Sequence, residues 1–294
     1  MINFLEKNKD ISSLSNFNTK ATCKYYYEIN NYWDINNIKE IIAFAKTNKL
    51  AYLFIWWWTN LLFAFDLYDW IIIKNNLIWY TYSKDTQILD VYSNELISDV
   101  SLNLRQKYGQ KLFERFIWLP WTVWWAIYWN AWCFWLEISN NFLEVDVLNL
   151  DTYKIETISK ENMNFTYRNS ILKEENKYFI IKAKFDLSKK IEKYSIGEVD
   201  IKDFRENKQP KWYSCWSFFK NPSKEQSAWY LIEKIWFKWF NLNWAYFSEL
   251  HSNFLINDWT AGYKDLLNLI NLAQKKVKKD FNLDLIPEVN IIYN

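Results

Sequence analysis

Glycine is scarce in this chain. The 294 residues include 3 glycines and 20 tryptophans, whereas glycine normally supplies ~7% of a protein, or roughly 20 residues at this length. Proline is scarce as well, at 4 residues, so the usual turn formers are few. The glycine deficit and the tryptophan excess suggest that the two residue types are exchanged.

The genetic code offers an explanation for this exchange. Some codes read the codon UGA as glycine, and a translation that reads UGA as tryptophan writes tryptophan at those glycine positions. The hypothesis predicts tryptophan wherever a turn or a close backbone approach needs glycine. A bulky residue at a glycine-only backbone conformation costs ~1–3 kcal/mol. About ten such positions would cost on the order of 10–30 kcal/mol, which exceeds the ~5–15 kcal/mol stability of a domain.

Two stretches carry the pattern. Phe116–Ile138 holds seven tryptophans among small residues, FIWLPWTVWWAIYWNAWCFWLEI, and its length suits a membrane span. Pro120, Thr122 and Asn130 interrupt it, and no positively charged flank orients it. With glycine restored it predicts a turn and a short helix of small residues, which either admits another molecule close to the backbone or packs tightly in the core. Ile55–Leu62 becomes IGGGTNLL, a strand followed by a glycine loop that suits a pyrophosphate.

Few cysteines and a balanced charge exclude several classes of protein. Cys23, Cys133 and Cys215 are odd in number and widely spaced, which fits neither a disulfide framework nor a zinc site. Basic and acidic residues are interspersed at a net charge of +2, so no basic stripe follows a phosphate backbone. The N-terminus lacks the apolar run of a signal peptide. We therefore expect a cytoplasmic globular protein that binds no metal and no nucleic acid.

Hydrophobic periodicity predicts a mixed α and β chain whose pattern changes near residues 209–222. Residues 1–20 are predicted to form a polar helix or arm, 164–172 a loop and 191–208 a helical connection. Strands are predicted at 23–29, 51–55, 70–74, within 77–89, and at 143–151, 154–159, 178–186, 252–256 and 289–293. Helices are predicted at 34–47, capped by Asp34, and at 93–108, ended by Gly109, then at 228–235 and 260–281.

Seven motifs give the chain a resemblance to a known family once glycine replaces most tryptophans. In chain order they are IWWWTNLL, LPWTVWWAIYWNAW, YRNS, SCWSFFKNP, SAWYLIEKIWFKWF, SELHSNFLIN and IPEV. They resemble the glycine loops and substrate motifs of UDP-N-acetylenolpyruvoylglucosamine reductase, in the shorter of the family's two subtypes. The resemblance extends over nearly the whole chain, and composition alone does not produce seven motifs in the family's order.

The resemblance implies an α+β fold and a redox function. It implies a vanillyl-alcohol-oxidase-type (PCMH-type) FAD-binding domain of two α/β subdomains, residues 1–76 and 77–200, and a C-terminal α/β substrate domain, residues 201–294. NADPH would reduce FAD, and a hydride would then pass to the enolpyruvyl group of the UDP-sugar to give UDP-N-acetylmuramate for peptidoglycan synthesis. We also expect a monomer that binds neither nucleic acid nor membrane.

The family's functional residues carry over by motif. Ser217 would be the proton donor, Arg168 would pair with the substrate carboxylate and Glu288 would complete the polarising set. Further substrate contacts would come from Tyr167, Lys220 and Asn221. The residues that would hold FAD are Trp56, Trp57, Trp58, Thr59, Asn60, Leu61, Pro120, Trp121, Thr122, Trp124, Trp125, Asn130 and Ala131.

Each catalytic assignment has an alternative. Without a catalytic role, Ser217 would be a turn residue or a cap. Arg168 would be a member of a surface ion pair, and Glu288 would be an exposed residue at a strand edge. His251 is the only histidine, and the family assigns it no catalytic role, so we interpret it as structural. Cys215 has no histidine near it in sequence and is not assigned as a nucleophile.

A different class of function applies if the tryptophans are genuine. A tryptophan-rich surface then indicates a module that stacks carbohydrates or lies at a membrane interface. Sugar-stacking tryptophans would be spaced along one face of a strand. Here they cluster beside Pro, Thr, Asn and Asp, which are common neighbours of glycine in turns. The codon at each tryptophan distinguishes the two interpretations.

Overall fold

The computed structural model describes residues 3–56, 60–119, 121–133, 135–189, 214–215, 217–223, 225–258 and 260–294. Its contacts divide the chain into two compact units. The first unit comprises Met1–Tyr27, Ala45–Ile73 and Asp203–Asn294, and the second comprises Glu28–Phe44 and Lys74–Lys202. The predicted helical connection at 191–208 and the predicted boundary at 200/201 fall outside the described residues, so the three-domain division stays a prediction.

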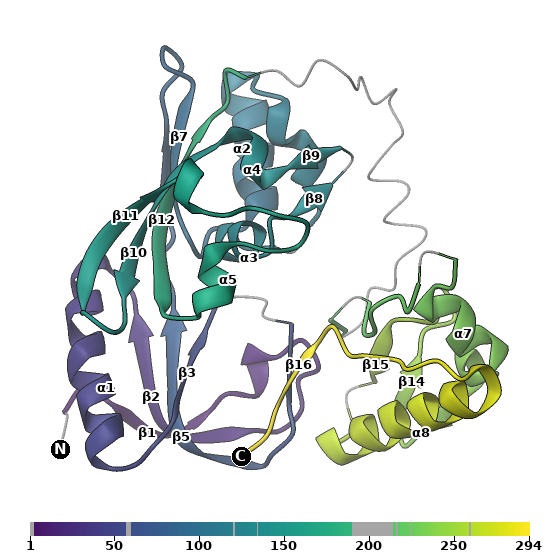
Figure 1. Ribbon diagram of the computed structural model, residues 1–294. Coiled ribbons are helices and arrows are strands. Elements are labelled where there is room, and N and C mark those ends of the chain that lie inside the picture. Colours follow the sequence, from purple (N-terminus) through teal and green to yellow (C-terminus); the bar gives the residue numbers. More distant parts are fainter. Residues whose placement is uncertain are drawn as a thin grey trace. The chain divides into compact units, whose positions relative to one another are not determined.

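The first unit contains a four-stranded sheet in the order β1-β2-β5-β3 (Figure 1). The strands are β1 (Glu6–Asp10), β2 (Thr22–Ile29), β3 (Tyr52–Ile55) and β5 (Leu67–Asn75). Residues 1–20 were predicted to form a helix or arm, and this prediction is wrong for β1. Strand β1 pairs antiparallel with β2, and Glu6 lies opposite Tyr26. Residues of β1 are mostly exposed and charged. An edge strand needs only main-chain pairing, so the sequence of β1 lacks an apolar pattern.

The predicted first helix is confirmed with a different start. It begins as a 3-10 helix, η2 (Tyr32–Asn36), and continues as α1 (Asn37–Thr47). The N-cap is Asn31, whose side chain accepts from the Trp33 N–H, while the predicted cap Asp34 accepts the Asn31 N–H in return. The side chains of the predicted apolar stripe, Ile38, Ile41, Ile42 and Ala45, are all buried.

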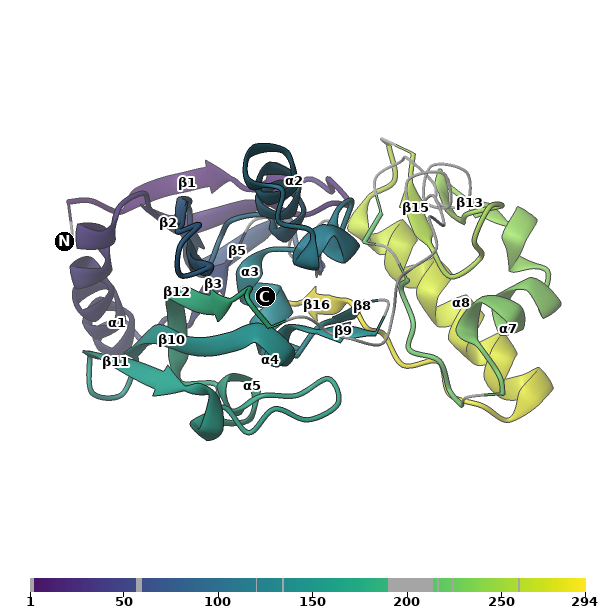
Figure 2. The same ribbon diagram turned by 90° about the horizontal axis from the view of Figure 1, so that it is seen from above.

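The C-terminal part of the first unit is a small sheet covered by helices. The sheet has the antiparallel order β13-β14-β15, formed by Asn241–Leu242, Ala245–Phe247 and Leu255–Asn257. Helix α8 (Tyr263–Phe281) lies along this sheet together with α7 (Ala228–Lys234) and the 3-10 helix η5 (Phe237–Trp239) (Figure 2). One side of α8 buries Leu266, Leu269, Ile270, Ala273 and Val277, the spacing of an amphipathic helix.

The last strand joins the C-terminal part to the strand after the glycine-like loop. Strand β16 (Asn290–Ile292) pairs parallel with β4 (Leu61–Phe63), with Asn290 opposite Leu61 and Ile292 opposite Phe63. Leu62 packs in the same buried cluster as the C-terminal helices, while Phe63 packs with the four-stranded sheet. Strand β4 therefore contributes to both hydrophobic cores of the first unit.

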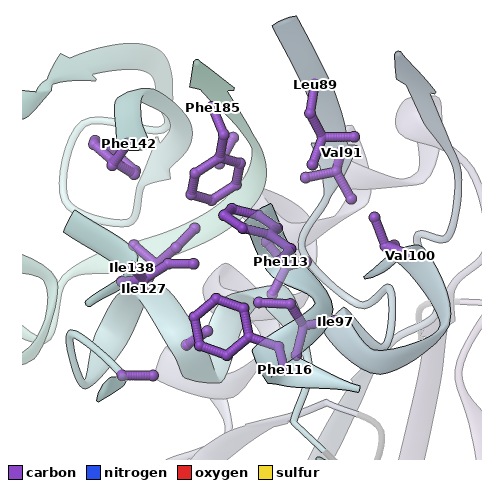
Figure 3. Close-up of a cluster of buried hydrophobic side chains, with 14 of the residues drawn as sticks. Leu89, Val91, Ile97, Val100, Phe113, Phe116, Ile127, Ile138, Phe142 and Phe185 are labelled. Carbon is purple, nitrogen blue, oxygen red and sulfur yellow. The ribbon is translucent and has the colours of Figure 1, made fainter. Parts of the chain in front are cut away.

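The second unit is built on a five-stranded antiparallel sheet, β11-β10-β12-β7-β6. The strands are β6 (Tyr80–Tyr82), β7 (Ile88–Tyr92), β10 (Phe142–Asn149), β11 (Lys154–Ser159) and β12 (Tyr178–Asp186). Phe113, Phe116, Phe142 and Phe185 form the centre of its core with aliphatic residues around them (Figure 3). Short elements complete the unit: η3 (Leu112–Phe116), α3 (Val123–Tyr128), β8 (Trp132–Cys133), β9 (Leu136–Glu137), α4 (Ile138–Asn141), η4 (Lys160–Asn162) and α5 (Ile171–Glu175).

The second predicted helix starts later than predicted. Helix α2 (Ile97–Tyr108) ends at Gly109, which has the left-handed φ of 70° expected of a helix C-cap. Ser93, the predicted start, is instead bound to β12, because its N–H donates to the Ile181 carbonyl and its hydroxyl to the Ile180 carbonyl. No helix in the described part of the chain is long and apolar enough to cross a membrane, and the residues 116–138 form several short elements.

Among the tryptophans that the structure describes, four have a backbone conformation that L-residues avoid. The φ angles are 69° at Trp118, 69° at Trp135, 66° at Trp236 and 70° at Trp244. Asparagine, which tolerates this region, accounts for most other residues with positive φ. The strain at a bulky residue is ~1–3 kcal/mol per position. The side chains of all four are also exposed, between 49% and 78%, so core packing does not compensate for the strain.

Candidate active site

The predicted proton donor lies on a segment that a buried asparagine holds in place. Ser217 forms an isolated bridge with Phe254. The Asn253 side chain donates to the Phe219 carbonyl (2.8 Å) and accepts from the Phe219 N–H (3.0 Å), and the Asn253 carbonyl accepts the Phe218 N–H (2.7 Å). Asn253 is 2% exposed. These bonds fix the backbone around Ser217, whose side chain is half-buried.

Glu288 lies on the neighbouring segment. Its N–H donates to the Phe218 carbonyl at 2.7 Å, and Pro287 forms a bridge with Phe219. The structure therefore brings the predicted residues Ser217 and Glu288 onto adjacent backbones, and Glu288 is exposed. The Glu288 side chain is exposed and the Ser217 side chain is half-buried, so both can be reached from solvent. Proline at 287 removes a donor at this position and fixes φ, which favours one course of the chain into Glu288.

Asn60, predicted to hold FAD, lies beside the same pair. Its carbonyl accepts the Asn290 N–H (2.9 Å), and its side-chain amide donates to the Glu288 carbonyl (3.4 Å). Its side-chain oxygen is buried and has no hydrogen-bond partner among the described residues. Trp56 and Leu61, on either side of the loop, are buried. Trp57, Trp58 and Thr59 lie outside the described residues.

Two predicted substrate residues follow Ser217. Lys220 is exposed, and its N–H donates to the Ile286 carbonyl at 2.8 Å. The Asn221 side-chain oxygen accepts the N–H of Ala228, the first residue of α7, at 3.0 Å. Asn221 therefore caps a helix through its oxygen, and only its amide group is available for a substrate.

His251 and Cys215 are consistent with structural roles. The Nδ1 atom of His251 accepts the Asn253 N–H at 3.3 Å, and its ring packs edge-on against Phe254. Burial lowers the pKa of His251, which favours the neutral ring. Cys215 is buried, and burial raises the pKa of its thiol. A thiol that stays protonated is a poor nucleophile.

In the second unit, α3 carries the predicted cofactor residues of the second glycine-like motif. Thr122 is its N-cap and accepts the Trp125 N–H at 3.2 Å. The N–H groups of Val123 and Trp124 donate to the carbonyls of Glu95 (2.9 Å) and Ser93 (2.7 Å). These three N–H groups thus have protein partners. Glycine at 124 and 125 would serve a close approach of the backbone to a cofactor, and not the donation of these N–H groups.

The indoles at this helix stack on neighbouring aromatic rings. Trp121 and Trp125 stack with ring centroids 4.6 Å apart, and Trp124 stacks on Tyr128 at 5.0 Å. All three tryptophans are half-buried. Glycine at these three positions would remove the indoles and leave the backbone open to a close approach. Ala131 is buried, Asn130 is 3% exposed and engaged in hydrogen bonds, and Pro120 lies outside the described residues.

Arg168 lies at the corner of a tight turn. Thr166 and Asn169 bond to each other through both N–H groups, at 3.2 Å each, so that Tyr167 and Arg168 form the two-residue tip. Arg168 has a φ of 57°, a strained value that is typical of functional positions. Its Nη1 atom is buried without a hydrogen-bond partner among the described residues. A buried, unpaired guanidinium nitrogen favours a ligand anion over the surface ion pair considered above.

Tyr167, the other tip residue, is 83% exposed, and its ring lies 5.9 Å from the Arg168 guanidinium carbon. The structure thus places the predicted residues in two groups. Asn60, Ser217, Lys220, Asn221 and Glu288 belong to the first unit, and the residues of α3, Tyr167 and Arg168 belong to the second. Sequence reasoning missed Asn253, although it lies inside the motif SELHSNFLIN.

Comparisons with known proteins identify the family. Residues 209–292 match the family model of the UDP-N-acetylenolpyruvoylglucosamine reductase C-terminal domain. A Clostridium botulinum protein named UDP-N-acetylenolpyruvoylglucosamine reductase is 33% identical over 261 residues, which is 87% of this chain and 83% of that protein. The chain belongs to the UDP-N-acetylenolpyruvoylglucosamine reductase family.

Two further comparisons concern a second relative and the fold. A Bacillus pumilus reductase of the same name is 35% identical over 176 residues, or 59% of this chain and 57% of the relative. The crystal structure of UDP-N-acetylenolpyruvylglucosamine reductase from Thermus caldophilus superposes with a TM-score of 0.73 at 19% identity, and covers 99% of this chain and 100% of that one. The structural likeness confirms the predicted α+β fold of the reductase family. Membership confirms the enzyme class, an FAD-dependent oxidoreductase, and the binding-module alternative gains no support.

Proposed function

We propose that this protein reduces the enolpyruvyl group of UDP-N-acetylenolpyruvoylglucosamine with electrons from NADPH, and so supplies UDP-N-acetylmuramate for peptidoglycan synthesis. The observation that carries the proposal is the pairing of the Ser217 segment with the Glu288 segment through the Phe218 carbonyl. These segments hold the family motifs SCWSFFKNP and IPEV, which are far apart in sequence. An unrelated flavoprotein is not expected to pair these two motifs.

The reaction adds a hydride and a proton across a carbon–carbon double bond. FAD, when bound, supplies the hydride to the methylene carbon. Negative charge then develops on the carbon next to the carboxylate and on the carboxylate itself. Arg168 would pair with this carboxylate, because its unpaired Nη1 can donate to an anionic oxygen. The Ser217 hydroxyl would then donate its proton to the carbanionic carbon and regain a proton from solvent.

Glu288 and Asn60 would support this step from the Ser217 side. The N–H of Glu288 bonds to the Phe218 carbonyl, so the main chain of Glu288 is fixed next to the residue that follows Ser217. A carboxylate there can orient the substrate or polarise a water that reprotonates Ser217. Asn60 would bring the first glycine-like loop beside the same site, since it bonds to both Glu288 and Asn290.

The proposed cellular setting follows from the same residues. Cys23, Cys133 and Cys215 are all buried free thiols, which supports a reducing cytoplasm as the location. We propose a monomer that acts on the UDP-sugar and NADPH, without nucleic acid or membrane as a partner. Size-exclusion chromatography with light scattering at working concentration tests the monomer.

The proposed reaction is tested by two half-reactions followed through flavin absorbance. NADPH should bleach the bound flavin, and the enolpyruvyl UDP-sugar should then restore its colour in the absence of oxygen. The same sugar without the enolpyruvyl group is the control and should leave the flavin reduced. A flavin that NADPH reduces but the enolpyruvyl sugar does not reoxidise would exclude the proposed substrate.

A further inference from the structure

Trp118 occupies the glycine position of a type II turn. The turn spans 116–119 and is closed by the Leu119 N–H, which donates to the Phe116 carbonyl at 3.1 Å. Ile117 has φ −59° and ψ 139°, and Trp118 has φ 69°. These are the angles of the two central residues of a type II turn, whose second position needs positive φ and is occupied by glycine. The indole of Trp118 is 49% exposed.

Trp236 occupies the glycine position of a helix end. Helix α7 ends at Lys234, and Trp236 follows with φ 66° and ψ 21°. Its N–H donates to the Glu233 carbonyl at 3.0 Å. A left-handed residue just past a helix is usually glycine, as it is at Gly109 after α2. Trp236 is 78% exposed, so its side chain contributes little packing in return.

Trp135 and Trp244 occupy the second positions of hairpin loops. Asn243 and Trp244 connect β13 to β14 with φ angles of 48° and 70°. Positive φ at both positions is the type I′ turn, for which Asn-Gly is the preferred pair. Trp135 follows residue 134 in the connection from β8 to β9 and has φ 69°. Four unrelated local structures therefore place tryptophan where each requires glycine.

We propose that the functional chain carries glycine at Trp118, Trp135, Trp236 and Trp244, because the cell that makes it reads UGA as glycine. The same codon rule then assigns glycine to Trp121, Trp124 and Trp125, whose indoles stack on neighbouring aromatic rings at α3. Trp33 is the contrasting position. It is 75% exposed, as open as Trp236, but it lies inside the 3-10 helix η2, where φ is negative and glycine is disfavoured.

The first test of this proposal reads the gene and the protein. The codons at Trp118, Trp135, Trp236 and Trp244 should be UGA, and tryptic peptides of the protein from its own cells should have the lower mass of glycine there. UGG codons at these four positions, or peptides with the mass of tryptophan, would overturn it.

The second test uses two recombinant chains, one as printed and one with glycine at the UGA positions. The glycine chain should purify with bound FAD at about one flavin per chain, and the printed chain should hold far less. Single changes Trp236→Gly and Trp244→Gly in the printed chain should each raise the denaturant midpoint, while Trp33→Gly should leave it unchanged or lower it. Equal flavin content in both chains would contradict the proposal. So would a lower denaturant midpoint for Trp236→Gly and Trp244→Gly than for the printed chain.

A separate observation concerns the turn that carries Arg168. Both ends of this turn are fastened to the C-terminal end of α3 and the residues just after it. The Asn130 side chain donates to the Thr166 carbonyl at 3.1 Å, and the Ser170 hydroxyl donates to the Tyr128 carbonyl at 2.9 Å. Ser170 is the N-cap of α5, yet its hydroxyl caps no N–H of that helix. Asn130 has a φ of 43° and also accepts the Ser139 N–H at 3.3 Å.

We infer that Asn130 and Ser170 are positioning residues that hold the Arg168 turn against α3. This inference rests on the proposed role of Arg168. The hydrogen-bonding groups described above already have protein partners, so neither side chain can use them to contact a ligand. Ser170 is fully buried and Asn130 is 3% exposed. Their bonds lie on both sides of the tip, so together they set where the guanidinium points. A displacement of about 1 Å can cost ~10²-fold in rate.

A double-mutant cycle tests this inference in whichever of the two chains binds FAD. Ser170→Ala should slow flavin reoxidation by the enolpyruvyl sugar about 10-fold or more, and slow reduction by NADPH much less. In an Arg168→Met background the same change should have little further effect, because the group it positions is gone. Asn130→Gly, which keeps the positive φ, should have the same effects as Ser170→Ala in both backgrounds. Asn176→Gly is the control, at an exposed left-handed position after α5.

The outcomes separate the two proposals. If Arg168→Met itself has no effect on reoxidation, the proposed role of Arg168 fails, and the inference fails with it. If Arg168→Met slows reoxidation and Ser170→Ala slows it by the same factor in both backgrounds, Arg168 is confirmed and the positioning role is rejected.

Discussion

The N–H of Glu288 donates a 2.7 Å hydrogen bond to the carbonyl of Phe218, the residue that follows Ser217. This main-chain bond holds the predicted acid and the predicted carboxylate on adjacent segments, whatever their side chains are. Substitutions at Ser217 and Glu288 should therefore change the chemistry and leave the fold intact. The two residues suit functional tests for that reason.

Ser217→Ala should leave reduction of the flavin by NADPH nearly unchanged and slow its reoxidation by the enolpyruvyl sugar. The first step needs no acid from the protein, whereas the second leaves a carbanion that must be protonated. The loss should be ~10²–10⁴-fold, with a much smaller change in substrate affinity. Stopped-flow absorbance measures both steps. An equal loss in both half-reactions would assign Ser217 to the turn and not to catalysis.

Glu288→Gln should also slow reoxidation while the denaturant midpoint stays within error of the parent. The substitution keeps the N–H that bonds to Phe218 and removes only the charge of an exposed side chain. Its matched control is Glu249→Gln, another exposed acidic residue of the same unit, which should change neither quantity. A lower midpoint with normal rates would instead make Glu288 a structural residue.

Asn253→Ala should destabilise the protein and reduce activity together. The change leaves the Phe219 N–H and carbonyl without their partners in a buried site. An unsatisfied buried polar group costs ~1–3 kcal/mol, so a loss of roughly 2–5 kcal/mol in unfolding free energy is expected. Urea denaturation followed by fluorescence gives this value. A midpoint equal to that of the parent would show that Asn253 is not what holds the Ser217 segment.

The cysteines should be unreactive in the folded protein. Burial raises the pKa of the Cys23 thiol from its ordinary value of 9.0 to about 12, so at pH 8 the nucleophilic thiolate is rare. A chromogenic thiol reagent should label no cysteine under native conditions and all three in denaturant. Rapid native labelling would contradict the buried placement.

The same pKa shift predicts a pH dependence of stability. The folded state keeps the Cys23 proton where the unfolded chain loses it, so the contribution is present below pH 9.0 and is lost as the pH rises toward about 12. Cys23→Ser, which replaces the thiol with a group that does not titrate there, should flatten this fall between pH 9 and 11 relative to the parent. Unfolding midpoints across that range measure it, and identical slopes would exclude Cys23 as the cause.

Much of the second unit could be predicted because its strands carry local patterns. The bounds of β11 and β12 match the prediction, and Gly109 ends α2 as expected. The prediction failed where a distant partner decides the structure. Ser93 looks like a helix start, but bonds to β12 keep it out of α2, and β1 forms only because β2 is beside it.

In the candidate site, too, local motifs could be predicted and residues that act through distant partners could not. The motifs identified Ser217, Arg168 and Glu288, because each lies in a short run of residues that can be compared directly. Asn253 and Ser170 could not be ranked from sequence, since their importance comes from bonds to Phe219 and Tyr128, 34 and 42 residues away. Serine and asparagine are common in loops for many reasons. Only the structure shows which of them fasten one segment to another.

The pairing of β16 with β4 has a consequence for synthesis. A ribosome releases β4 and the Asn60 segment early, but their partner strand emerges only after Glu288, 228 residues later. Until then the edge of β4 has no neighbour, and the Asn60 carbonyl lacks its Asn290 donor. Such a distant pairing is slow to form. The segment at Asn60 therefore completes its pairing only after β16 has left the ribosome, and nascent chains that lack β16 should leave β4 unpaired.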